Sequence, residues 1–176
     1  MNTHRFPPTR TAALEHLAAF LPKTGAIYAA QRNYDLGPEQ HVGVSQLSPY
    51  IRHRILPETE VLQATLGRFS PSTAEKFVQE VLWRTYWKGW LEQRPSVWDD
   101  YRQGLHQRLN DIQTQSGQRK AWEQACHGNS GIDCFDHWAQ ELVQTGYLHN
   151  HARMWFASIW IFTLRLPWEL GADFFM

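Results

Sequence analysis

The sequence contains little cysteine, no excess charge of either sign and no long hydrophobic run. Two cysteines, Cys126 and Cys134, are too few for the disulfide framework of a small secreted protein. Basic and acidic side chains both number 17, so no bulk charge draws the chain to nucleic acid or acidic lipid. The longest apolar stretch, Met154 to Leu164, falls well short of the ~20 residues that span a bilayer. Residues 1–8 lack the apolar core of a signal peptide, so we expect a cytoplasmic protein.

Aromatic residues, in contrast, are abundant. They make up 14% of the chain, and nine of them are tryptophan, which usually fills large pockets or recognition surfaces. A length of 176 residues suits one compact domain. No alternating strand pattern, internal repeat, Rossmann glycine motif or P-loop is present. The apolar residues instead recur at helical spacing, which predicts an all-α fold.

Helix boundaries follow from proline, glycine and capping residues. Ser72 with Glu75 three residues later predicts a capping box, Ser48 before Pro49 predicts an N-cap, and Gly146 predicts a C-cap. Turn-forming residues predict loops over 33–46 and 127–131. We expect helices over residues 11–20, 26–31, 48–54, 57–67, 74–93, 98–109, 118–126, 132–145 and 150–166, and a last one that opens at Pro167.

The helix expected over 74–93 mixes charges with aromatic rings on one face. At 100° per residue, Phe77, Glu80, Trp83, Arg84 and Trp87 fall within an arc of roughly 120°. Such a face suits a flat, partly charged ligand, because rings stack, arginine holds an anion and glutamate accepts hydrogen bonds. The alternative is a core helix in which Glu80 and Arg84 pair at i,i+4 where burial ends. Spacing alone leaves both interpretations open.

Histidine and cysteine could suggest a zinc site, but their spacing argues against one. The residues in question are His127, His137, His149, His151, Cys126 and Cys134. They form no paired ligand motifs, and two histidines separated by one residue do not share a helical face. We therefore expect no metal.

Three segments, taken together, resemble a known family. They are Val44-Ser-Gln-Leu-Ser-Pro-Tyr50, Gln79-Glu-Val-Leu-Trp-Arg-Thr-Tyr86 and Gly146-Tyr-Leu-His-Asn-His-Ala-Arg-Met154, and Leu166 to Phe175 continues the match. Their order and spacing resemble the flavin-binding helical domain of the DNA photolyase/cryptochrome family. The resemblance implies an N-terminal helical extension over 1–24 and a truncated FAD-binding helical domain over 25–176.

The resemblance also implies a role for individual residues. Ser45, Leu47 and Ser48 match positions that hold the FAD diphosphate, and Arg153 matches an arginine that pairs with an acidic residue near the flavin. The implied FAD-binding residues are Tyr28, Ser45, Leu47, Ser48, Phe77, Arg84, Asn150 and Arg153. The implied catalytic residues are Glu80 and Trp83 against the pyrimidine dimer, Asn150 beside flavin and substrate, and Met154 on the lesion side. Trp122 and Trp168 match the outer and middle members of an electron-transfer relay.

The activity that the resemblance implies is that of a DNA photolyase, a carbon–carbon lyase. Light-excited reduced FAD would donate an electron to a flipped-out pyrimidine dimer in ultraviolet-damaged single- or double-stranded DNA, the cyclobutane ring would split, and the electron would return. Two alternatives stay open: a cryptochrome-like flavin photosensor without repair activity, and a fragment that is inactive on its own.

Several residues depart from the family pattern. Val44 stands where a threonine is frequent, and Phe77 replaces a tryptophan. His151 and Gln46 replace basic residues, which makes DNA repair less secure than flavin binding. The sequence also ends before the family's Asp-Gly-Asp…Asn segment and Trp-rich motif, and it has no antenna domain. We therefore expect a fragment of a longer protein with an incomplete flavin pocket and no site for a second chromophore.

Overall fold

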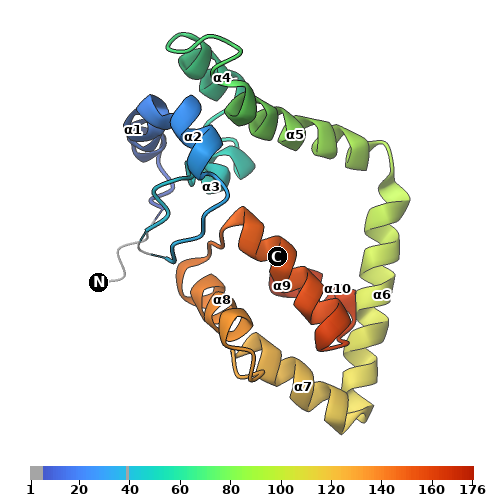
Figure 1. Ribbon diagram of the computed structural model, residues 1–176. Coiled ribbons are helices and arrows are strands. Elements are labelled where there is room, and N and C mark those ends of the chain that lie inside the picture. The colour runs from blue at the N-terminus through green and yellow to red at the C-terminus, as the bar shows by residue number, and fades with distance from the viewer. Residues whose placement is uncertain (1–5, 39) are drawn as a thin grey trace. The chain divides into compact units, whose positions relative to one another are not determined.

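The computed structural model describes residues 6–38 and 40–176, and within them all regular structure is helical (Figure 1). The expected all-α class is therefore confirmed. The chain divides into two compact units, the first ending at Gln93 and the second running from Arg94 to Met176. Each unit has its own hydrophobic core and is described by itself. The domain boundary expected at residue 24 stays a prediction.

The first unit is built around two helices that contact α5. Its elements are α1 (Arg10–Phe20), a 3-10 turn (Leu21–Lys23), α2 (Ala26–Gln31), α3 (Ser48–Arg52), α4 (Glu58–Leu66) and α5 (Glu75–Glu92). Helices α2 and α4 both pack against α5. Apolar side chains at helical spacing on α1, α2, α4 and α5 meet in one core, which includes Leu17, Tyr28, Val61, Phe77 and Val81. This core fixes the direction in which the polar residues of α5 point.

The second unit packs α10 on α6 and α9 on α8. Its elements are α6 (Pro95–Thr114), α7 (Ser116–Cys126), α8 (Asp133–Thr145), α9 (Asn150–Ser158), a π-helical turn (Ile159–Thr163) and α10 (Trp168–Phe174). The core is aromatic, with Phe156 stacked on Phe135 at 4.2 Å between ring centroids and Trp160 beside both. Figure 1 shows the red α10 lying against the yellow α6.

Two predicted N-terminal caps are wrong. Helix α5 begins at Glu75 after Ala74, which makes no side-chain cap, and Ser72 instead contacts the Ser70 hydroxyl. The backbone N–H of Thr73 donates to Ser70 Oγ, so the serine and threonine hydroxyls organise the preceding turn. Helix α3 has Leu47 at its N-cap, so Ser48 is the first helical residue. The serine residues thus predicted where both helices begin, but the capping hydrogen bonds predicted for them are wrong.

Helix ends marked by proline or glycine agree with the prediction. Helix α4 follows Pro57 and ends before Gly67, and α8 ends at Gly146, whose φ of 67° is left-handed. Helix α6 is longer than expected because Pro95 occupies its first turn. The helix expected over 150–166 is shorter: α9 ends at Ser158, and the π-helical turn that follows ends at Thr163. Among the residues described, no helix has the length and apolar character that crossing a membrane requires.

Candidate functional site

Tyr28 of α2 and Phe77 of α5 form the contact between these two helices. Their rings meet edge to face with centroids 5.0 Å apart, and Phe20 packs against both. Tyr28 is 8% exposed and Phe77 only 3%. Both predicted cofactor-contacting residues therefore lie in the core of the first unit, where they set the distance between α2 and α5.

One turn further along both helices, Arg32 forms an ion pair with Glu80. Arg32 ends α2, four residues after Tyr28, and Glu80 follows Phe77 by three on α5. The aromatic contact and the ion pair thus join the same two helices at successive turns. The interpretation of Glu80 and Arg84 as an i,i+4 pair is wrong, because α2 supplies a closer partner for Glu80. Sequence reasoning missed Arg32, although its spacing from Tyr28 was the available signal.

Arg84 is directed toward α4, where three cationic side chains surround the carboxylate of Glu58. Glu58 Oε1 lies 3.7 Å from Arg84 Nε and 3.6 Å from Lys88 Nζ, and Glu58 Oε2 accepts a 3.3 Å hydrogen bond from Arg54 Nη1. The Arg84 Nε and Lys88 Nζ atoms are both buried, and neither has a hydrogen-bond partner in the described part of the chain. We call these four residues the Glu58 cluster. Three cations face one carboxylate, so the cluster has an excess of positive charge.

Electrostatics in the Glu58 cluster shift two pKa values. Burial by itself raises the pKa of Glu58, but a hydrogen bond from its own backbone N–H and the charges of Lys88, Arg54 and Arg84 outweigh burial and lower it. Burial lowers the pKa of Arg84, and the charge of Glu58 opposes that effect. Glu58 is therefore ionised at neutral pH, and partial desolvation makes Arg84 more responsive to a further anion.

The segment from His41 to Ser48 connects this region to α3. Gly43 passes so close to α2 that a Cβ at this position would lie 2.8 Å from the Gln31 carbonyl oxygen. Gln46 has a left-handed φ of 51°, an uncommon conformation for a residue other than glycine. The Leu47 N–H donates to Ser45 Oγ at 3.4 Å, while Leu47 itself is buried. The segment is therefore held in one shape by its backbone.

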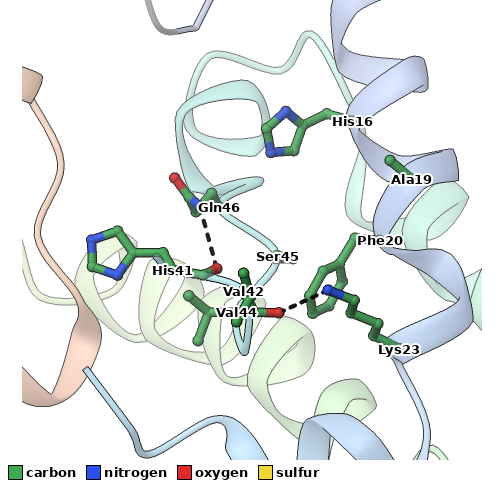
Figure 2. Close-up of a pocket in the computed structure, with 9 residues that line it drawn as sticks. All are labelled: His16, Ala19, Phe20, Lys23, His41, Val42, Val44, Ser45 and Gln46. Carbon is green, nitrogen blue, oxygen red and sulfur yellow. Dashed lines mark hydrogen bonds between the residues drawn. The ribbon is translucent and has the colours of Figure 1, made fainter. Parts of the chain in front are cut away.

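A pocket of about 230 Å³ opens beside this segment (Figure 2). In Figure 2 the Lys23 amine reaches the Val42 carbonyl, and the Gln46 amide reaches that of His41, at 3.3 and 3.4 Å. The pocket is lined by His16, Ala19, Phe20, Lys23, His41, Val42, Val44, Ser45 and Gln46. Ser45 is the only residue of the predicted FAD-binding set among them, and Leu47 and Ser48 do not line the pocket.

Trp83 begins a ladder of aromatic rings along the exposed side of α5. Trp83, Tyr86, Trp87 and Trp90 make successive edge-to-face contacts with centroids 5.4–5.7 Å apart. Trp83 and Trp87 are each 52% exposed. The helix thus separates the residues predicted to share a face: Phe77 is buried, Glu80 and Arg84 are half-buried in ion pairs, and the two tryptophans are exposed.

In the second unit, the three predicted site residues of α9 are all exposed. Asn150 is the first residue of the helix, after His149, whose ring caps it by accepting from the His151 N–H. Arg153 Nε donates to the Leu148 carbonyl at 3.0 Å, and its guanidinium lies 5.5 Å from the Phe175 ring centroid. Met154 is 63% exposed. The predicted catalytic residues are therefore divided, with Glu80 and Trp83 in the first unit and Asn150 and Met154 in the second.

Trp122 and Trp168 occupy different environments. Trp122 on α7 is half-buried against the core of the second unit. Trp168 begins α10, is 50% exposed and borders an apolar pocket of about 180 Å³ with Phe156, Trp160 and Phe175. Within residues 94–176 no ring contact joins Trp122 to Trp168. The two rings are therefore not in direct contact, and their predicted relay roles stay a prediction.

The donors of the first unit fit an anionic, aromatic cofactor. Buried nitrogen atoms without hydrogen-bond partners, as in Arg84 and Lys88, are costly unless a ligand satisfies them. The hydroxyl of Ser45 and the amine of Lys23 border a pocket that is large enough for a phosphate group. Each of these two groups of donors can bind an anion through charge-assisted hydrogen bonds.

Comparison with known proteins agrees with this chemistry. The family model for the FAD binding domain of DNA photolyase matches residues 77–176. The chain is 27% identical to the deoxyribodipyrimidine photo-lyase of a Synechococcus species, over 96% of this chain and 35% of that protein. It is 32% identical to the enzyme of the same name from Thermus thermophilus, over 92% of this chain and 36% of that protein. It thus spans about a third of the length of the curated relatives it matches.

Structural comparison gives the same fold. A bacterial class III photolyase from Agrobacterium tumefaciens superposes with a TM-score of 0.78 at 23% identity, over 97% of this chain and 34% of that one. The expected cofactor, FAD, is confirmed at the level of the family by the matching domain. By this match, the chain belongs to the family of FAD-binding domains of DNA photolyases.

Proposed function

We propose that this chain holds FAD as part of a cytoplasmic photolyase that splits pyrimidine dimers in ultraviolet-damaged DNA. The observation that carries the proposal is the Glu58 cluster. Arg84, which matches a cofactor-contacting position, has a buried Nε atom without a hydrogen-bond partner, and Lys88 Nζ beside it is in the same state. An anionic group bound here would satisfy both donors and balance the excess charge.

Different residues of the chain would bind different parts of FAD. Arg84, with Ser45 and Ser48, would hold the diphosphate of FAD, while Tyr28 and Phe77 fix the spacing of the helices behind it. Asn150 and Arg153, both on α9, match positions that contact the flavin in the family. When bound in its reduced form and excited by light, FAD supplies a strongly reducing electron. The chain needs no acid or base for that electron to enter and leave the dimer.

Glu80 and Trp83 would bind the damaged bases. Trp83 presents a ring that is half exposed, and Glu80 offers carboxylate oxygens as hydrogen-bond acceptors one turn away. Met154 matches a lesion-side position of the family and is exposed on α9. The ion pair with Arg32 keeps Glu80 directed toward α2 in the absence of DNA, so lesion binding would draw the carboxylate from one partner to another.

Titration with FAD tests the cofactor part of this proposal. We expect saturable uptake, seen as quenching of flavin fluorescence, and an affinity about tenfold weaker or more in Arg84→Gln, because a charged hydrogen bond is worth roughly 1.5–3 kcal/mol. Arg68→Gln is the matched control, since Arg68 contacts only the Phe69 ring among the interactions described. Equal affinity of both variants would remove Arg84 from the site, and no uptake by the wild-type chain would show that it does not bind FAD alone.

Repair of an oligonucleotide that contains a thymine dimer, under blue light and with reduced FAD, tests the lyase activity. We expect Glu80→Gln to lower the yield of repaired DNA, while Glu75→Gln, an exposed residue on the same helix, leaves it unchanged. Flavin uptake without any repair would favour the photosensor alternative. That alternative draws support from Gln46, whose neutral amide donates to the His41 carbonyl where the family has a basic residue.

A further inference from the structure

Two tryptophans and a tyrosine form a continuous chain of rings on the second unit. Trp98 and Tyr101 are one turn apart on α6, and their ring centroids lie 5.4 Å apart. Tyr101 faces Trp168 at the start of α10, with centroids 5.8 Å apart. Both pairs are tilted by 41°; the first lies within α6, and the second belongs to the packing of α10 on α6. The contacts therefore rest on two helices that are fixed against each other.

The three rings differ in their access to solvent. Trp98 and Trp168 are each 50% exposed, whereas Tyr101 between them is 9% exposed. Burial raises the pKa of the Tyr101 phenol, and the nearby charge of Asp173 raises it further. The phenol thus keeps its proton in the resting protein, and the negative charge of Asp173 favours a positive charge on the ring. A protonated, buried tyrosine connects two rings that solvent can reach.

We propose that Trp168, Tyr101 and Trp98 form a one-electron relay that carries oxidation from Trp168 to the surface at Trp98. Electronic coupling between rings falls steeply with distance, so successive ring contacts provide a better path than separated rings. Trp122, the outer relay member that the family resemblance implies, makes no ring contact with Trp168 in the described structure. The contacts instead lead from Trp168 into α6.

Each transfer conserves electrons and protons. A one-electron oxidant removes an electron from Trp168 and leaves an indole cation radical. Tyr101 returns an electron to Trp168, and its phenolic proton passes to water. Trp98 then supplies an electron to the tyrosyl radical, which takes its proton back, while the oxidised Trp98 indole releases its N–H proton to solvent. A soluble thiol reduces the Trp98 radical by donating a hydrogen atom and becomes a thiyl radical.

The proposal rests on the proposed function only for the identity of the oxidant, a photo-excited flavin in its oxidised or semiquinone state, which the electron from Trp168 reduces. It is tested without flavin, by pulse radiolysis of the full chain with azide radicals, which oxidise exposed indoles. The background is Tyr86→Phe, because Tyr86 contacts Trp83 and Trp87 and would accept oxidation from them. Without a thiol to reduce Trp98, the electron exchange between Trp98 and Tyr101 is reversible and favours the tyrosyl radical. We therefore expect tryptophan-radical absorption to decay as tyrosyl-radical absorption grows, at a rate independent of protein concentration.

Adding Tyr101→Phe should abolish this growth, while adding Tyr34→Phe, an exposed tyrosine of the first unit, should retain it. Trp98→Phe with Trp168→Phe should remove the transfer as well, whereas Trp155→Phe, which is 63% exposed on α9, should not. Undiminished tyrosyl growth in Tyr101→Phe, or in the double tryptophan variant, refutes the relay. Failure of the chain to take up FAD would leave this result unaffected, so the two proposals fail separately.

Discussion

Replacing Glu58 by glutamine removes one negative charge from a place where three positive charges meet. Glutamine keeps the size of the side chain, but Arg84 Nε at 3.7 Å, Lys88 Nζ at 3.6 Å and Arg54 Nη1 at 3.3 Å would then face a neutral amide. The Arg84 and Lys88 nitrogen atoms have no other hydrogen-bond partner to compensate. The variant therefore leaves mutual repulsion among cations that are partly removed from water.

The expected loss lies between two limits. Exposed ion pairs contribute roughly 0–1 kcal/mol, and removing one partner of a fully buried pair costs about 3–5 kcal/mol. The side chain of Glu58 is only 10% exposed, but those of Arg84 and Lys88 are 27% and 33% exposed, so water screens the cations. We expect Glu58→Gln to lower the free energy of unfolding by about 1–2 kcal/mol at neutral pH.

The loss should also depend on pH in a defined direction. The pKa of Glu58 is lowered in the folded protein, so its contribution is present above the unfolded-state value of about 4.3 and disappears as the pH falls through the folded-state value. Urea unfolding of wild type and variant should therefore differ at neutral pH and converge in acid. Glu60→Gln is the matched control, because Glu60 pairs with Arg10 at the surface of the same helix. An equal loss in both variants, or a loss that persists in acid, would refute the reasoning.

Three further changes should have measurable effects. Asp136→Ala should cost about 1–3 kcal/mol in urea unfolding, and less in acid, because the carboxylate accepts three hydrogen bonds from the preceding loop and these lower its pKa. Gly43→Ala should weaken FAD uptake in the fluorescence titration, since the added Cβ would lie 2.8 Å from the Gln31 carbonyl oxygen and displace the loop. Trp160→Phe should cost about 1–3 kcal/mol in thermal or urea unfolding, because the Pro167 carbonyl loses its 2.8 Å indole donor inside the core.

Much of the fold could be predicted from local signals. Pro57 and Gly146 each limit a helix through their own backbone conformation, which needs no knowledge of the rest of the molecule. Helix α6 extends beyond the predicted range of 98–109 at both ends, and polar residues dominate it. In the structure Gly104 provides room for Glu169, whose Oε1 would lie 3.0 Å from a Cβ there. The reason for that glycine is a contact with another helix, which no local pattern contains.

The partners of the site residues could not be predicted in the same way. Glu80 and Arg84 are four residues apart, which favours an ion pair when a helix is considered alone. In the structure each forms an ion pair with another helix: Glu80 with Arg32 at the end of α2, and Arg84 with Glu58 at the start of α4. The family resemblance indicated which residues matter, but it did not indicate what holds them. Only packing between helices decides that.

These partners bear on how α5 could serve both a core and a ligand. A charged side chain inside a helix interface is costly unless an opposite charge accompanies it, and α2 and α4 each provide one at the border of the core. Any ligand that binds Glu80 or Arg84 must then compete with a protein partner or share it. The two cases differ. Glu80 is paired with a single cation, whereas Arg84 belongs to a cluster with more cations than carboxylates. An anion can join the Glu58 cluster without breaking it, while a ligand for Glu80 has to displace Arg32.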